Sequence, residues 1–198
     1  MYGFTDDNVK NKKNIPIEMG VEVGPCSLTE CKYSSGEKNG KKWKAVEFYF
    51  KKGEGSLRHT LFEQTNIRPL PNETQEQAVI RVQRNFNTIL KDIAIEVGVD
   101  QNDLKKIEGS SFEEVVKSYC DLVNKNITNQ VWLKIGKNRS GYNELCTSGR
   151  FIAKYDITDT TGPGFVYSSR EESLINAANS DEILEEILSK APSISEQL

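Results

Sequence analysis

Aromatic rings and positive charges alternate in the segment WKAVEFYFK at residues 43–51. Successive side chains of a strand point to opposite faces, so an apolar face is expected from Val46, Phe48 and Phe50. The other face carries Trp43 and Tyr49 together with Lys51. More lysines flank the segment on both sides: Lys41, Lys42, Lys44 and Lys52. Flat rings with cations between them suit a single-stranded nucleic acid, because bases stack on the rings while the cations bind the phosphates.

The segment VWLKIGKNRSGY at residues 131–142 repeats this combination. If Val131, Leu133 and Ile135 face the core, Trp132 and Lys134 face the opposite way. The loop that follows adds two cations and a ring: Lys137, Arg139 and Tyr142. Folding alone offers a second explanation, since aromatic residues favour strands and lysines protect strand edges from aggregation. Both explanations stay open.

Residue types suited to catalysis or metal binding are sparse. His59 is the single histidine and lies between Leu57 and Leu61 in a predicted strand, which is typical of a structural or surface residue. The four cysteines lack the close pairing that a zinc site needs: Cys26, Cys31, Cys120 and Cys146. We expect reduced thiols, no cofactor and no enzymatic activity, because no set of nucleophile, base and oxyanion donor emerges from the sequence.

The strands and turns that position these residues follow from the hydrophobic period. Residues 15–67 alternate with a period near two and are divided by the turns GEKNG and KKGEGS, which predicts a three-stranded antiparallel meander. Asn39–Gly40 suits a tight hairpin turn, because both residues tolerate a positive φ. Gly24–Pro25 predicts a bulge or bend in the long first strand.

A helical period replaces the strand period at about residues 72–126 and predicts two amphipathic helices. Their starts carry the capping pairs Thr74/Gln77 and Ser111/Glu114. Strand pattern returns in residues 130–156 with turns at GKNRSG and TSGR, and one or two further helices are expected after residue 168.

Charge is distributed unevenly along the 198 residues. Residues 169–198 hold two basic against seven acidic residues, which leaves the rest of the chain mildly basic although the total is -3. Residues 1–14 are polar and predict a flexible N-terminal arm. The sequence contains neither the apolar region of a signal peptide nor a membrane span, so we expect a cytosolic protein.

The order of three strands, a helical connection and a β-hairpin is the layout of an oligonucleotide-binding (OB) fold. Within this layout NIPIEMGVEVGPCSLTECKYSSGEKNGKKWKAVEFYF, the following SLRHTLFE and the later GKNRSGYNEL resemble the phage-type single-stranded DNA-binding proteins. The resemblance implies base stacking by the aromatic residues Trp43, Tyr49 and Trp132. It implies phosphate contacts by the basic residues Lys41, Lys42, Lys44, Lys51, Arg58, Lys137 and Arg139. The long helical segment and the amphipathic acidic end depart from the family pattern.

We therefore expect an α+β protein with a mainly antiparallel OB-like β-barrel over residues 15–168 and a helical insertion at about residues 72–126, between strands three and four. An acidic, partly helical segment follows at residues 169–198, and we expect it to contact replication or recombination proteins. The expected function is sequence-tolerant binding of single-stranded DNA in DNA replication or recombination, in the host cytoplasm if the chain is phage-encoded, without cofactor, metal or membrane. The alternative is a non-enzymatic structural or adaptor protein of phage assembly, which would use the same face for protein contacts.

Overall fold

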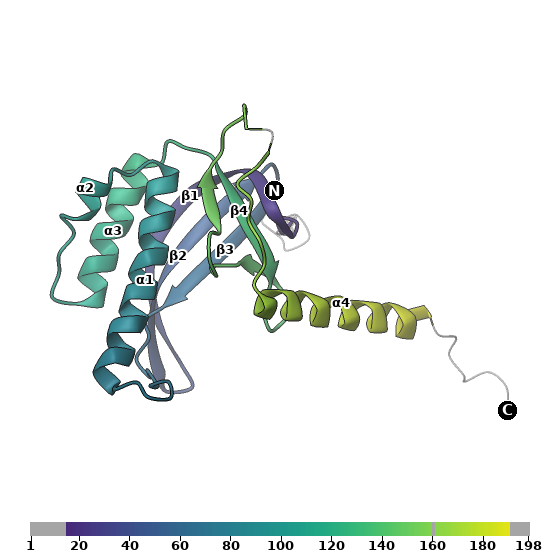
Figure 1. Cartoon of the computed structure of the whole chain (residues 1–198), viewed down its shortest axis with the longest axis horizontal. Coiled ribbons are helices and arrows are strands. Elements are labelled where there is room, and N and C mark those ends of the chain that lie inside the picture. Colours follow the sequence, from purple (N-terminus) through teal and green to yellow (C-terminus); the bar gives the residue numbers. More distant parts are fainter. Residues whose placement is uncertain (1–14, 160, 191–198) are drawn as a thin grey trace, which may run out of the picture.

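The structure, a computed structural model, describes residues 15–159 and 161–190, with residues 182–190 described by their backbone alone. The arm expected at residues 1–14 and the chain end at residues 191–198 lie outside the described residues. A curved antiparallel sheet forms the body, helices cover one of its faces, and a last helix projects away from it (Figure 1).

The first three strands form the predicted meander. They pair antiparallel in chain order and are β1 (Gly20–Lys38), β2 (Lys41–Lys52) and β3 (Gly55–Phe62). A two-residue turn joins β1 to β2, with Asn39 at φ 53° and Gly40 at φ 73°. This positive-φ geometry explains why the Asn-Gly pair is found there.

The remaining strands extend the sheet on the other side of β1. They are β4 (Val131–Lys137), β5 (Asn143–Leu145) and β6 (Ile152–Lys154), and the order is β3-β2-β1-β4-β5 with β6 also paired to β4. β1 serves both halves of the sheet, because residues 20–26 pair with β4 and residues 27–38 pair with β2. The change of partner follows Gly24–Pro25, where the sequence predicts a bend.

The sheet is open and does not close into the predicted barrel. β3 and β5 stand at the two ends of the strand order, and the described residues contain no β-ladder between them. An extended segment at residues 15–17 lies between the two strands instead. The Ser56 N–H of β3 donates to Ile15 O at 2.8 Å, and Asn143 Nδ2 of β5 donates to Ile17 O at 2.8 Å. This segment is hydrogen-bonded to both end strands and therefore occupies the position in which β3 and β5 would have to pair directly to close a barrel.

Three helices follow β3, which confirms the helical insertion predicted between strands three and four. They are α1 (Gln75–Val97), α2 (Gln101–Leu104) and α3 (Phe112–Asn126). Thr74 and Gln77 form the predicted capping box at the start of α1, and Ser111 caps α3. The apolar stripe of α3 packs on the predicted core face of β2 and on β1, and α1 packs beside α3 and on β6. The shared buried core includes Val46, Phe48, Phe50, Ile93, Val97, Val116 and Val123.

The acidic segment forms one helix over its described length, α4 (Ser169–Lys190). Figure 1 shows that α4 leaves the body beside the β4–β5 hairpin and points away from the sheet. Within residues 15–159 and 161–190, no helix is both long enough and apolar enough to cross a membrane.

Candidate nucleic-acid interface

The face of β1–β3 opposite α1 and α3 is called the outer face here. Strand register places Tyr49 of β2 between Arg58 of β3 and Glu30 of β1. These three residues line a depression of about 600 Å³ together with Lys51 and Ser56. Tyr49 is half-buried, whereas Lys51 and Arg58 are exposed. A flat ring with two accessible cations at its edge therefore lies in a hollow of the sheet.

Polar contacts orient the Tyr49 ring. Its hydroxyl donates a hydrogen bond of 2.5 Å to Glu47 Oε2. The ammonium of Lys32 lies 4.7 Å from the centroid of the ring and 3.8 Å from Glu47 Oε2. Hydrogen bonding to Tyr49, followed by the charges of Glu30 and Glu47, raises the pKa of Lys32 above its ordinary value. The ring is thus positioned before any ligand binds, and Lys32 remains a cation at neutral pH.

Trp43 lies further along the outer face, towards the β1–β2 turn. It is half-buried and packs over its cross-strand partner Gly36, where a Cβ would lie 2.8 Å from Trp43 Cζ2. Its ring meets that of Phe62 edge to face, with centroids 5.8 Å apart. Phe62 is 49% exposed. These two rings form a second aromatic patch, which packing already orders and which solvent can still reach.

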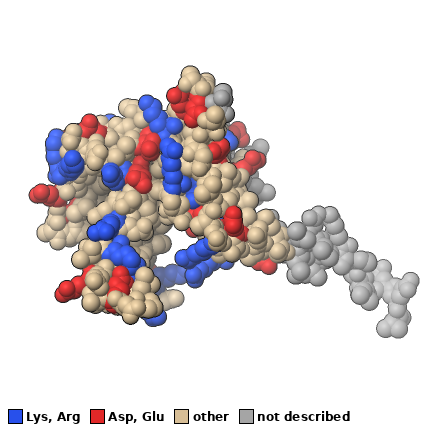
Figure 2. Space-filling model, viewed as in Figure 1, with Lys and Arg blue, Asp and Glu red and all other residues tan. Residues whose placement is uncertain are grey.

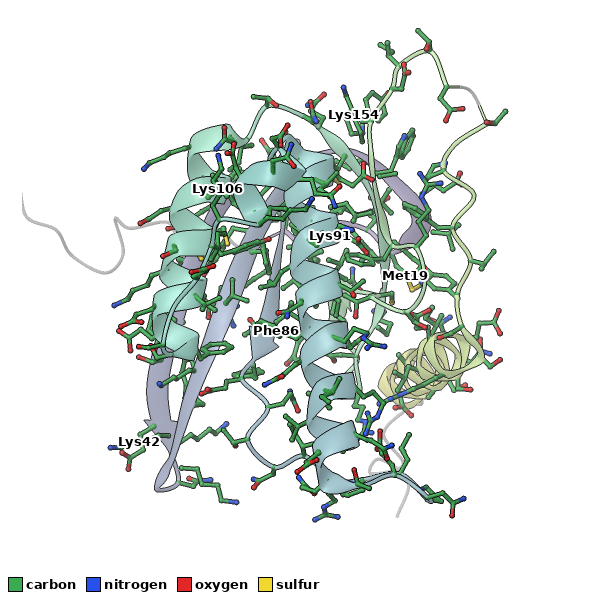
Figure 3. The ribbon with its side chains drawn as sticks, turned by 60° about the vertical axis from the view of Figure 1, so that its left-hand side comes forward. Met19, Lys42, Phe86, Lys91, Lys106 and Lys154 are labelled. Carbon is green, nitrogen blue, oxygen red and sulfur yellow. The ribbon has the colours of Figure 1, made fainter. Side chains whose placement is uncertain are left out.

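The lysines of the β1–β2 hairpin are divided between the two faces. Lys41 and Lys42 are exposed, and Figure 3 shows Lys42 at the tip of the hairpin. Alternation puts Lys41 on the side of Trp43, but Lys42 and Lys44 on the side of Val46, which α3 covers. Consistent with this placement, the pKa of Glu113 on α3 is lowered mainly by its ion pair with Lys117, and the charge of Lys44 adds to the effect. The expectation that all three lysines border one face is therefore corrected.

Lys134 is buried, which corrects the expectation that it lies at the surface. Its side chain is 0% exposed, and its ammonium donates hydrogen bonds to Ser148 O, Val166 O and Glu171 Oε2, the last at 3.1 Å. Glu171 also accepts hydrogen bonds from the N–H groups of Ser148 and Ser168. Alternation along β4 does put Lys134 opposite the core, but the chain after β5 folds back over that face. Lys134 is thus a structural ion-pair residue and not a phosphate contact.

Trp132 is packed against the sheet. A Cβ on Gly24 would lie 2.5 Å from Trp132 Cε3, and the Trp132 ring lies 4.8 Å from that of Tyr155. Its Nε1 is buried and has no hydrogen-bond partner among the described residues. Gly24 and Gly36, the glycines beneath the two tryptophans, are twelve residues apart on β1, or about 40 Å along an extended strand. Trp132 therefore does not share a surface with Trp43.

The loop between β4 and β5 lies beside α4, because its residues 138–141 line a recess together with residues of α4: Leu174, Ala177, Ala178 and Asp181. Asn138 Oδ1 accepts hydrogen bonds from the N–H groups of Ser140 and Tyr142, which shapes the loop. Tyr142 is 73% exposed and Arg139 is exposed, while Lys137 is half-buried. The loop is tied to the depression through residues 15–17, because these contact both Asn143 and Ser56. Figure 2 has the view of Figure 1, with α1 in front of the sheet, and shows Lys and Arg atoms on both sides of the hollow between the lower part of α1 and the root of α4; this hollow is on the helix side of the sheet and is not part of the outer face.

Two residues that contribute to this surface were not predicted from the sequence, Lys32 and Phe62. Both lie on strands adjacent to β2 and reach the aromatic residues only through register. For Lys32 the signal is the hairpin turn at Asn39–Gly40, from which residues 32 and 47 can be counted as partners; for Phe62 it is the turn between β2 and β3, from which residues 45 and 62 can be counted as partners.

The single histidine and the four cysteines are all buried. The described residues include no group of three or more His, Cys, Asp or Glu side chains able to hold a metal ion. His59 is buried against Phe48, and burial lowers its pKa to about 4. Cys31 and Cys120 are also buried, with their sulfur atoms 3.2 Å apart between β1 and α3.

The chain has no match among protein-family models, curated proteins or solved structures.

Proposed function

We propose that the protein binds single-stranded DNA on its outer face, with little dependence on base sequence. The observation that carries the proposal is the depression around Tyr49, in which an oriented ring and the cations Lys51 and Arg58 line one hollow. A base stacked on a tyrosine ring gains roughly 1–3 kcal/mol, and every base has a face that can stack. The neighbouring cations would then bind the phosphates on either side of that base.

The arrangement of the strands supports an OB-like fold for this purpose. β1 is long and shared by both halves of the sheet, the helices fall between β3 and β4, and the strand order is β3-β2-β1-β4-β5. OB folds are partly open barrels that bind oligonucleotides on strands two and three and in the loops after strands one and four. In this chain the corresponding loops are the hairpin at Lys38–Lys41 and the loop with Arg139 and Tyr142.

Within this proposal each outer-face residue has a defined role. Tyr49 is the central stacking residue, and Trp43 with Phe62 is a second stacking point towards the hairpin. Phosphates meet the cations of the outer face and its loops: Lys32, Lys41, Lys51, Arg58, Lys137 and Arg139. Such a protein needs no cofactor and turns over no substrate, and it would act where single strands arise, in DNA replication or recombination.

A titration of labelled oligo-dT with matched variants tests the proposal. Tyr49→Leu should weaken binding roughly 5- to 100-fold, while Tyr49→Phe, which keeps the ring but loses the hydrogen bond to Glu47, should lose much less affinity than Tyr49→Leu. Arg58→Gln should reduce the slope of log affinity against log salt by about 0.7, the value for one phosphate contact on a single strand. Lys154→Gln, an exposed lysine on β6, serves as the control and should leave the slope unchanged.

Equal affinities of the wild type, Tyr49→Leu and Arg58→Gln at low salt would refute the proposal. Tryptophan emission gives a second readout, because a base that reaches the patch of Trp43 and Phe62 should quench Trp43. Trp132 is packed away from that surface and should contribute a constant background.

An adaptor protein is the second candidate, and the projection of α4 from the body favours it. Acidic residues of α4 would then contact replication or recombination proteins, or components of phage assembly. Removing residues 182–198 separates the two candidates, since this truncation keeps Glu171 and its contact with Lys134. A DNA-binding protein should retain its affinity for oligo-dT after the truncation, whereas an adaptor should lose its protein partner and never bind the oligonucleotide.

A further inference from the structure

A second recess lies on the helix side of the sheet, between α1, α3 and the chain that leads from β3 to α1. Its volume is about 410 Å³. Phe86 of α1 and Phe112 of α3 line it with half-buried rings, whose centroids are 5.5 Å apart at an angle of 48°. Figure 3 shows Phe86 on the side of α1 that faces α3. The recess therefore offers aromatic surface to a ligand.

The polar lining of the recess suits a neutral ligand with hydrogen-bonding edges. Gln64, Gln83 and Asn87 are exposed amides, and each amide supplies both donors and an acceptor. Glu63 is the acidic member of the lining, which contains no lysine or arginine. A phosphate would be repelled there, whereas an unstacked nucleobase has flat faces for the rings and polar edges for the amides.

The recess and the outer face are next to each other where β3 ends. Phe62 ends β3 on the outer face beside Trp43, and the next two residues, Glu63 and Gln64, line the recess. Gln64 Nε2 also donates to Phe62 O at 3.3 Å, so the two regions are joined directly. β3 is an end strand of the sheet, and a nucleic acid strand lying on the patch of Trp43 and Phe62 can therefore cross this edge.

Cations are placed to bind the phosphates on that route. Lys42 and Lys44 point to the helix side of the hairpin and cannot serve the Tyr49 depression. Lys44 is adjacent to the start of the recess, because its carbonyl accepts a hydrogen bond from the Glu63 N–H. The nearby carboxylate of Glu113 is paired with Lys117 at 2.6 Å, and the charge of Lys44 acts on it only as a smaller, additional effect.

We infer that the recess between α1 and α3 holds one unstacked base of a DNA strand that wraps from the outer face over the end of β3. The inference rests on the proposed function and extends it, since it gives the helical insertion a part in binding. It predicts two classes of contact: short oligonucleotides occupy the outer face alone, and longer ones also fill the recess.

A blocking substitution with a matched control tests the inference. Gln83→Trp places a ring at the mouth of the recess, and Asn85→Trp places the same ring on a different side of α1, among Ile80, Arg81 and Arg84. Oligo-dT of increasing length is titrated against both variants and the wild type, and thermal unfolding checks that all three are equally folded. We expect Gln83→Trp to weaken binding of long oligonucleotides about 5- to 100-fold, the value of one stacked base, and to leave short ones unaffected.

Photocrosslinking with an oligonucleotide that carries a single 5-iodouracil gives an independent readout. In the wild type, adducts should map to peptides that contain Phe86 or Phe112 when the probe occupies one position of a long strand. The inference is overturned if no probe position gives these adducts and both tryptophan variants bind long strands equally. The recess would then be left to a protein segment.

The two hypotheses fail in different ways. If Tyr49→Leu weakens binding of every oligonucleotide while Gln83→Trp changes none, DNA binding on the outer face stands and only the recess is excluded. If no oligonucleotide binds at low salt, the proposed function fails, and the recess fails with it.

Discussion

The buried ion pair between Lys134 and Glu171 gives a stability prediction of defined size. Lys134→Met keeps most of the length of the side chain in its buried position but removes the ammonium. The variant leaves the carboxylate of Glu171, whose side chain is 11% exposed, without a cation. It also leaves the carbonyl groups of Ser148 and Val166 without the donor that they share in the wild type.

The expected loss follows from what remains around Glu171. Removing one partner of a buried ion pair costs about 3–5 kcal/mol of unfolding free energy. Glu171 keeps hydrogen bonds from the N–H groups of Ser148 and Ser168, so the lower end of that range applies. For a protein of this size, about 3 kcal/mol corresponds to a decrease in Tm of roughly 6–12 °C.

The dependence on pH has a definite sign. Burial alone would raise the pKa of Glu171, but hydrogen bonds from Ser168 and Lys134 outweigh burial and lower it. A carboxyl group with a lowered pKa stabilises the folded state above its ordinary pKa of about 4.3, and this contribution is lost as the pH falls further. The difference in stability between the wild type and Lys134→Met should therefore be largest at neutral pH and shrink in acid.

Thermal and urea unfolding followed by circular dichroism measure these effects. The double variant Lys134→Met/Glu171→Gln removes both charges but keeps an oxygen acceptor for Ser168, and it should recover part of the lost stability. Lys154→Met, on an exposed position of β6, is the control. If Lys134→Met unfolds at the wild-type temperature, the ion pair does not hold the C-terminal segment on β4 and the reasoning is wrong.

Three further predictions concern buried groups elsewhere. His59 is 7% exposed, and burial lowers its pKa to about 4. Its neutral form should therefore contribute about 3 kcal/mol to the unfolding free energy above pH 6.5, and this contribution should disappear as the pH falls towards 4. The single histidine signal in an NMR titration measures this pKa, and a value near 6.5 would contradict the burial. Trp132→Ala should lower the unfolding free energy by roughly 3 kcal/mol, the lower end of the range for removing a core tryptophan, because the ring fills the space above Gly24 but is only half-buried. It should leave oligo-dT binding of the folded protein unchanged; weaker binding without loss of stability would show that Trp132 is a stacking residue. Burial raises the pKa of Cys26 to about 11 and that of Cys146 to about 12. A thiol reagent at pH 8 should therefore react slowly with the folded protein, whereas all four cysteines should react rapidly after unfolding in urea. Rapid reaction of the folded protein would contradict the burial.

Local patterns in the sequence predict most of the elements. The period of two, the Asn39–Gly40 turn and the capping residues depend on neighbours within a few positions, and the structure has the meander, the hairpin and the helical insertion where these signals lie. The failure to close a barrel depends on residues 15–17, which contact β3 and β5 across more than 120 positions of sequence in the case of Asn143. No local period contains that information.

The candidate site shows the same division between local and distant information. Alternation correctly separates Tyr49 from Phe48 and Lys134 from Leu133, because the side-chain period of a strand is set by the backbone. Alternation cannot say what lies over the second face. Around Tyr49 that face of β2 stays accessible and lines a depression, whereas over β4 the chain from Leu145 to Glu171 returns and buries Lys134.

A cation beside an aromatic residue in the sequence therefore indicates nucleic-acid binding only if no other part of the chain covers the two side chains. Lys51 and Arg58 remain predicted phosphate contacts, because their side chains are exposed in the depression around Tyr49. Lys134 is different, since its ammonium is buried and already donates a hydrogen bond to the carboxylate of Glu171, where a phosphate would otherwise bind. Lys42 and Lys44 lie on the helix side of the sheet and not on the expected outer face, because successive residues of the hairpin point to opposite faces. Because the hairpin lysines are divided between the two faces, a bound DNA strand that uses all of them must pass around the edge of the sheet.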